Sequence, residues 1–126
     1  MLIVPARHLT LVAAHVAGMD VDSEVFATGS SNYLDVTVTV HTMYAVGTPP
    51  TAHLLVSVYG SNDGNGWFAL PDFPTEDITA GSGVTEFSGY ATTALLRFHF
   101  AHAVTNSNPG DWATAILCCH AKLTQH

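Results

Sequence analysis

The alternation of apolar and polar residues between positions 34 and 41 constrains the fold more than any other feature of this chain. In Leu34-Asp35-Val36-Thr37-Val38-Thr39-Val40-His41 the even positions are apolar and the odd positions are polar. Successive side chains of a β-strand point to opposite faces, so this pattern predicts a half-buried strand with one face on a core. Strand character resumes at Ala52 and continues to Tyr59.

The two strands are separated by Gly47-Thr48-Pro49-Pro50, which interrupts a ladder because proline has no N–H to donate. Folding the chain about Thr48 pairs Val40 with Val56, and Val38 with Val58. That register places every valine on one face. The sequence therefore predicts a hairpin here, as part of a meander.

A second turn signal is Gly60-Ser61-Asn62-Asp63-Gly64-Asn65-Gly66-Trp67. Asn and Asp hydrogen-bond to their own backbone, and Gly adopts positive φ without steric cost. We interpret Asn62, Asp63 and Gly64 as a structural turn that closes a β-hairpin, with Trp67 folding back over the sheet as a core anchor. The alternative interpretation of Trp67 is a binding platform for a sugar or a protein.

Further patterns predict a first strand at Leu9–Val16, a strand at 95–100 with Leu96, Phe98 and Phe100 inward, and a nearly all-apolar, central strand at Trp112–Leu123. Residues 71–89 are rich in Pro, Gly and acids, which predicts a long surface connection with a short strand near Val84–Phe87. No segment has a sustained helical period. The fold class is therefore all-β, a single antiparallel β-sandwich that is jelly-roll-like. Residues 1–25 form an N-terminal arm and first strand, and 26–126 the β-sandwich, one domain overall.

Composition restricts the partners. Only 10% of the 126 residues are charged, three of them Lys or Arg, and the net charge is -7. Three scattered cations cannot neutralise a run of phosphates, so we expect neither nucleic acid nor an anionic membrane as a partner. A chain this apolar and this poor in charge favours burial of part of its surface in an oligomer or a larger assembly.

Cys118 and Cys119 are adjacent in a predicted strand and point to opposite faces, so they are poorly placed to form a disulfide with each other. Two thiols fit a reducing compartment better than a secreted disulfide framework. The N-terminus is not a convincing signal peptide, and no apolar run reaches the ~20 residues of a membrane span. We expect synthesis in a cytoplasm.

No catalytic or metal-binding pattern stands out among these residues. The eight histidines include no His-x-His pair, and the best candidate pair is His41 and His53 across the predicted hairpin. The chain has no Gly-x-Ser-x-Gly elbow, and Cys118 and Cys119 lack cationic neighbours that would activate a thiol. The sequence predicts a protein that is not an enzyme and uses no cofactor and no metal.

The motifs at 34–40 and 55–64, together with Trp67, Leu70 and Leu95-Leu96-Arg97-Phe98, resemble small virion proteins of tailed bacteriophages. The resemblance covers about residues 26–104. It implies a β-sandwich that decorates or cements the capsid, bound to the major capsid protein on the capsid exterior, and a homo-oligomer such as a trimer. The hairpin motif is also similar to that of discoidin-like carbohydrate-binding modules, so an adhesion module is an alternative, as is a head–tail connector or tail component.

The predicted capsid or subunit contacts come from two segments. One is the mobile N-terminal arm, residues 1–7, and the other is the long loop after the hairpin. The contact residues in them are Leu2, Ile3, Val4, Pro5 and Arg7, and Asp72, Phe73 and Pro74.

Overall fold

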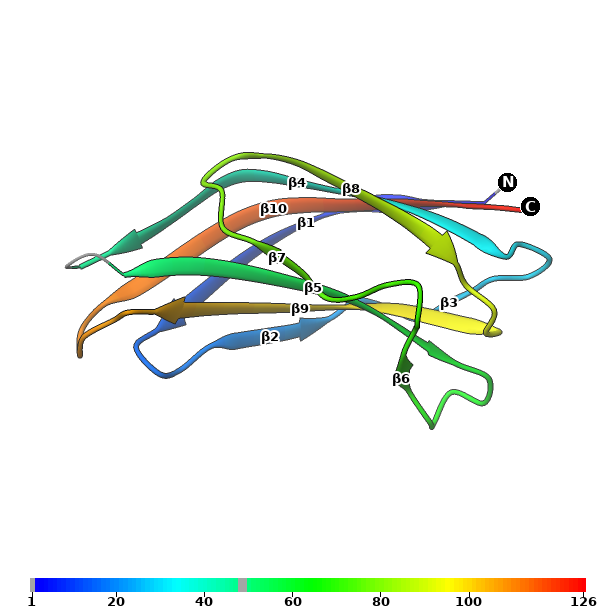
Figure 1. Cartoon of the computed structure of the whole chain (residues 1–126), viewed down its shortest axis with the longest axis horizontal. Coiled ribbons are helices and arrows are strands. Elements are labelled where there is room, and N and C mark those ends of the chain that lie inside the picture. The colour runs from blue at the N-terminus through cyan, green and yellow to red at the C-terminus, as the bar shows by residue number, and fades with distance from the viewer. Residues whose placement is uncertain (1, 48–49) are drawn as a thin grey trace.

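Two antiparallel β-sheets packed face to face form this protein (Figure 1). The computed structural model describes residues 2–47 and 50–126, with side chains from residue 8 onward. The predicted all-β sandwich is confirmed. The part of the chain described contains no helix, and so none long and apolar enough to cross a membrane.

Sheet A has four strands in the order β1-β10-β4-β8. Their bounds are Leu2–Ala14 for β1, Trp112–Thr124 for β10, Tyr33–Val46 for β4 and Gly83–Tyr90 for β8. The prediction of a central last strand is confirmed, because β10 lies between β1 and β4. Strands β1 and β8 are the edges of this sheet.

Sheet B has the order β2-β9-β5-β6, with β3 also pairing with β9 and β7 with β5. Its strands are Met19–Asp22 (β2), Phe26–Ala27 (β3), Thr51–Ser61 (β5), Phe68–Ala69 (β6), Glu76–Ile78 (β7) and Leu95–Thr105 (β9). If β2 with β3, and β6 with β7, each count as one interrupted strand, eight strands remain. Their order in the two sheets is that of a jelly roll.

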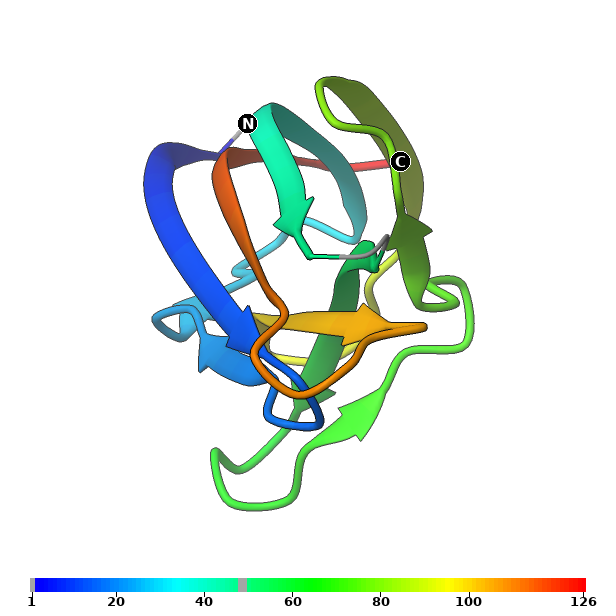
Figure 2. The same ribbon diagram turned by 90° about the vertical axis from the view of Figure 1, so that its left-hand side faces the viewer.

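The alternating residues supply the core between the sheets. Val36, Val38 and Val40 of β4 are buried, as are Val56 and Val58 of β5. The inward positions of β9 are Leu96, Phe98 and Phe100, as predicted. Figure 2 shows the two layers nearly end-on, with β4 and β10 above β9 and β5.

The predicted hairpin between residues 34–41 and 52–59 is wrong. Strand β4 pairs with β10 and β8 in sheet A, whereas β5 pairs with β9 in sheet B. The connection after Val46 is a corner between the layers, and Gly47 adopts a φ of 139° there. Alternation determines which face of a strand is buried. It does not show whether two alternating strands are neighbours in one sheet or lie opposite each other across the core.

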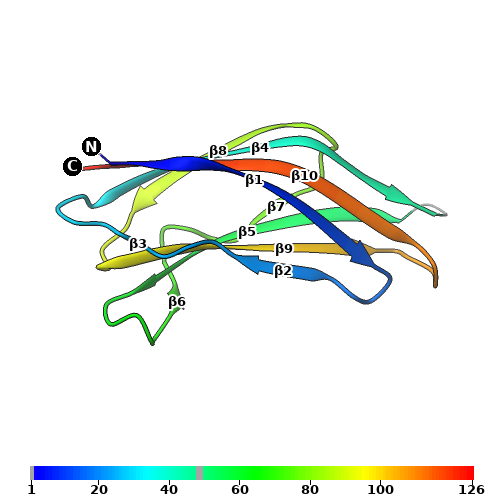
Figure 3. The same cartoon turned by 180° about the vertical axis from the view of Figure 1, so that it is seen from behind.

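The first strand is longer than predicted. Backbone pairing of β1 with β10 begins at Leu2, opposite Leu123, and the strand ends at Ala14 before a turn in which Val16 has a φ of 52°. The prediction of a mobile arm at residues 1–7 is therefore wrong for the backbone of residues 2–7. The start of β1 and the end of β10 lie at the same end of sheet A, where Leu2 pairs with Leu123 (Figure 3). The predicted surface connection at 71–89 contains β7 and most of β8.

Candidate interaction surface

The outer face of sheet A, which points away from sheet B, carries a set of large apolar side chains in contact with solvent. We call this set, together with Ala14, the apolar half. Its large members are Val12 (53% exposed), Tyr44 (49%), Val46 (40%), Ile116 (38%) and Trp112 (37%). Strand register makes them neighbours. Trp112 lies between Ala14 and Val46, and the next outward rank joins Val12, Thr114 and Tyr44.

Aromatic rings from different strands are in contact in this part of the surface. The Trp112 and Tyr44 rings meet edge-on with centroids 6.0 Å apart, and the imidazoles of His8 and His41 stack at 5.5 Å. His41 is the additional residue of a β-bulge opposite Ile116 and Leu117. Residues 8–14, 39–46 and 112–118 include no Asp, Glu, Lys or Arg. These segments of β1, β4 and β10 therefore carry no fixed charge.

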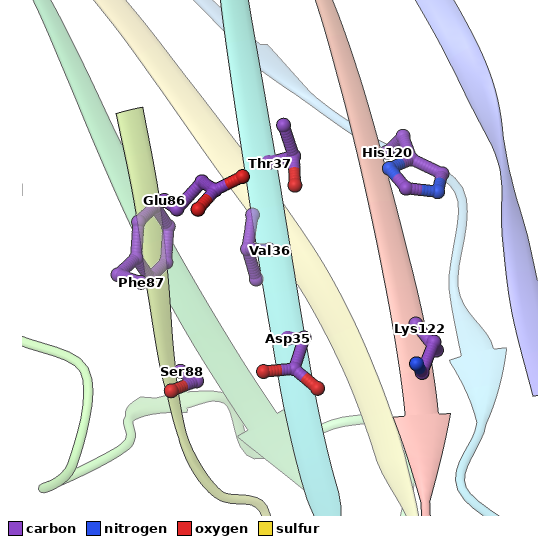
Figure 4. Close-up of a pocket in the computed structure, with 8 residues that line it drawn as sticks. All are labelled: Asp35, Val36, Thr37, Glu86, Phe87, Ser88, His120 and Lys122. Atoms are coloured by element: carbon purple, nitrogen blue, oxygen red, sulfur yellow. The ribbon is translucent and has the colours of Figure 1, made fainter. Parts of the chain in front are cut away.

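The other end of the same face is a polar groove of about 380 Å³, which we call the charged half. Its outward side chains are Asp35, Thr37, Glu86, Ser88, His120 and Lys122. In Figure 4 the basic residues come from β10 and the carboxylates from β4 and β8.

The charged groups of this groove do not pair with one another. Lys122 and Asp35 are opposite each other in the ladder, as are His120 and Thr37. Among the described residues, however, no ion pair or hydrogen bond joins the side chains of Asp35, Glu86, His120 and Lys122 to any other group. Their bonding capacity is free for a partner.

The predicted turn is confirmed in detail. Strands β5 and β6 form a hairpin, with Tyr59 opposite Ala69. The Asp63 Oδ1 atom accepts hydrogen bonds from the backbone N–H groups of Asn65 (2.8 Å) and Gly66 (2.9 Å). These bonds favour the carboxylate and hold the pKa of Asp63 below its usual value of 3.8. Asn62 extends the turn to the rest of the sheet, because its Oδ1 accepts from the N–H of Ala94.

The prediction that Trp67 anchors the core is wrong. Its side chain is only partly buried, its Nε1–H donates to the Gly64 carbonyl, and its ring lies over Arg97. Arg97 is an outward position of β9, so Trp67 folds back over the outer face of sheet B. The turn was predictable from residue types, but the side of the sheet on which the tryptophan lies was not.

The predicted contact residues separate into three groups. Leu2, Ile3, Val4, Pro5 and Arg7 are backbone positions of β1, and their side chains lie outside the described part. Phe73 is 3% exposed and packs against Phe87 at 6.2 Å, so it belongs to the core and the predicted contact is wrong. Asp72 and Pro74 are exposed, although an Asp72 oxygen accepts the N–H of Tyr90.

The predicted pair of histidines does not form. The candidate pair His41 and His53 lies on different sheets, because the hairpin that would have joined them does not exist. His53 is held by Asp77 and Thr105 instead. Across residues 2–47 and 50–126, no three His, Cys, Asp or Glu side chains are placed to hold a metal ion.

The two cysteines point to opposite faces, as predicted. Both are free thiols, Cys118 half-buried on the outer face of sheet A and Cys119 in the core. Burial raises the pKa of Cys119 to about 12, so this thiol is neutral at physiological pH.

The apolar half is the feature that sequence reasoning missed. Its members lie on three strands that are far apart in the chain, so only the register shows that they are neighbours. One signal was present: Trp112 and Ile116 are large apolar residues at outward positions in the first half of β10.

No protein-family model and no curated protein matches the chain. Among solved structures, the Yersinia pseudotuberculosis-derived mitogen is similar at 14% identity, with a TM-score of 0.45 over 97% of this chain and 86% of that one. The VP2 subviral particle of infectious bursal disease virus is similar at 10% identity and a TM-score of 0.41, over 94% of this chain and 33% of that one. The T13 particle of the same virus is similar at 11% identity and a TM-score of 0.38, over 95% of this chain and 36% of that one. The chain thus spans about a third of these viral chains, and similarity at this level does not extend to function.

Proposed function

We propose that this chain is a non-enzymatic structural protein of a virus particle, a decoration protein that binds the outer surface of a tailed-phage head and stabilises it. The observation that carries the proposal is the apolar half of sheet A. Five large apolar side chains stand 37–53% exposed on one uncharged surface. Contiguous exposed apolar surface of this kind marks a site of protein–protein contact.

Two further properties support an assembly role. The motifs at 34–40 and 55–64 resemble tailed-phage virion proteins, and the chain is poor in charge. Strands β1 and β8 leave one side of their backbone unpaired within sheet A, so a strand of the major capsid protein can add to an edge by β-augmentation. At one end of β8 this is blocked, because Asp72 already accepts the N–H of Tyr90.

The proposed mechanism is multivalent clamping. An oligomer of this protein contacts several capsid subunits at once, and linked weak contacts give a high overall affinity. The clamp opposes separation of neighbouring subunits under internal DNA pressure.

Co-sedimentation with expanded heads that lack the protein tests the proposal. We expect saturable binding at a fixed stoichiometry and fewer ruptured heads on heating. Ile116→Lys, in the apolar half, should abolish binding. Val25→Lys is the matched control, because Val25 is similarly exposed at 49% but lies in the connection between β2 and β3. Failure to bind any capsid form contradicts the proposal, and binding to purified tails alone replaces it with a tail component.

A second candidate function is a carbohydrate-binding adhesion module. It is favoured by the position of Trp67, whose ring lies on the surface over Arg97 instead of in the core. A ring in such a place can stack on a sugar. Glycan-array binding that Trp67→Ala removes, with the fold intact, would support this function, and an array without signal would exclude it.

A further inference from the structure

We infer that the outer face of sheet A binds a second copy of this chain, face to face, about a two-fold axis parallel to the strands. This inference rests on the proposed function only in that it assigns the apolar half to contacts between copies and leaves the edge strands β1 and β8 for the capsid. Self-association through this face does not itself require a role in a virion. The argument rests on the polarity of the face, on its unpaired charges and on its size.

The polarity of the face determines the direction of the axis. One end of the face is apolar and the other is charged, and the central strands β10 and β4 carry residues of both halves. A two-fold axis lying across the strands would place the apolar half of one copy on the charged half of the other. An axis parallel to the strands places like on like, so apolar surface is buried on apolar surface.

The register then determines which residues meet. An axis between β10 and β4 places β10 of one copy over β4 of the other at the same height. Each β10 residue therefore faces the residue of the second copy that corresponds to its own ladder partner. Trp112 faces Val46, and Lys122 faces Asp35.

The charges of the groove are complementary in this arrangement. Lys122 and His120 on β10 approach Asp35 on β4, and Glu86 lies one strand further across. In the single chain none of these groups forms an ion pair among the described residues. Asp35 and Lys122, which are unpaired in one copy, therefore have partners of opposite charge in the pair, and His120 lies beside the two carboxylates of the other copy.

The size of the face and the net charge of the chain are both compatible with dimer formation. Four strands of this length cover on the order of 700 Å² at ordinary strand spacings, close to the area that each partner contributes to a standard interface. The chain has a net charge of -7, but of its ten acids only Asp35 and Glu86 belong to this face, where Lys122 offsets one of them. The remaining acids lie on other surfaces, except Asp111, which is buried.

A charge-exchange experiment tests the interface. We expect the wild-type protein to be a dimer in sedimentation equilibrium. Asp35→Lys and Lys122→Asp should each raise the dimer dissociation constant about tenfold or more, because each homodimer then contains two like-charged contacts. Mixing the two variants should restore a tight heterodimer, since both contacts are again of opposite sign. Asp20→Lys, on β2, is the control for net charge and should leave the dissociation constant unchanged.

A wild-type protein that stays monomeric at high concentration overturns the inference, and so does a mixture that associates no more tightly than its components. Circular dichroism of each variant confirms that the fold is intact. Because no capsid is present, the result is independent of the virion role. A dimer that does not bind heads would contradict only the proposed function, and a head-binding monomer only this interface.

Discussion

The guanidinium of Arg97 lies 4.4 Å from the centroid of the Trp67 ring, on the outer face of sheet B. Asp22 orders the same cluster, because its carboxylate is 3.9 Å from Arg97 Nη1 and 2.6 Å from His99 Nδ1. The Trp67 side chain is therefore held on the sheet by a cation–π contact and not by burial in the core.

This arrangement predicts a small cost for removing the tryptophan. Trp67→Ala should lower the free energy of unfolding by about 1–2 kcal/mol, from the lost cation–π contact and partial burial. Phe73→Ala is the comparison, because Phe73 is 3% exposed, and truncation of a core Phe costs about 3–5 kcal/mol. Urea denaturation measures both. A larger loss for Trp67→Ala than for Phe73→Ala would place Trp67 in the core after all.

Asp63 should show a lowered pKa in an NMR titration. The N–H groups of Gly66 and Asn65, and the Ser61 hydroxyl, favour its carboxylate, so the titration midpoint should lie below 3.8. A folded-state pKa below the unfolded value means that this contribution to stability is present above the unfolded pKa and is lost as the pH falls through the folded one. Asp63→Asn should remove this loss of stability at low pH. A titration midpoint of Asp63 at or above 3.8 would contradict the turn geometry.

The two thiols should differ in reactivity. Cys118 is half-buried on the outer face of sheet A, whereas Cys119 is in the core with a pKa of about 12. In dilute native protein a maleimide should label Cys118 first, and only denaturant should expose Cys119. Mass spectrometry of wild type and Cys118→Ser measures this. Rapid native labelling of Cys118→Ser would show that Cys119 is accessible.

Substitution of Gly47 and of Gly83 by alanine should show how much stability is lost to backbone strain and how much to a steric collision, because the two glycines have nearly the same φ. Gly47 has a φ of 139° and Gly83 a φ of 141°, but a Cβ at Gly47 would collide with the Asp111 carboxylate, whereas nothing lies within 4 Å at Gly83. Gly83→Ala should cost about 1–3 kcal/mol from strain alone. Gly47→Ala should cost about 1–3 kcal/mol more, because Asp111 is buried and accepts the N–H of Asn108. Equal losses in thermal denaturation would contradict the collision.

Local patterns predicted the strands well, because side-chain alternation is a property of a single strand. The inward set Leu96, Phe98 and Phe100 and the opposite facing of Cys118 and Cys119 followed from it directly. The turn at 61–66 was equally predictable, because its hydrogen bonds join near neighbours in the chain: Ser61 Oγ accepts the N–H of Gly64, and Asp63 Oδ1 accepts the N–H of Asn65.

Local patterns did not predict which strands pair with each other. Val40 and Val56 both face the core, but they belong to opposite sheets. Two strands that each have one apolar face can lie side by side in one sheet or opposite each other in two sheets, and both arrangements bury the apolar faces. The pattern could therefore not distinguish a hairpin from a connection between the sheets. The side of the sheet on which Trp67 lies and the burial of Phe73 also depend on tertiary contacts, which residue types in a hairpin or a loop do not specify.

The sequence by itself determined that this protein is a β-sandwich, because period-two alternation and Asx-Gly turns act over a few residues. Only the tertiary structure decided which strands are neighbours, and with that the surface offered to a partner. Val12, Tyr44 and Trp112 lie far apart in the chain and form one apolar surface because β1, β10 and β4 align in one register. Such a surface depends on long-range pairing, which no local pattern specifies.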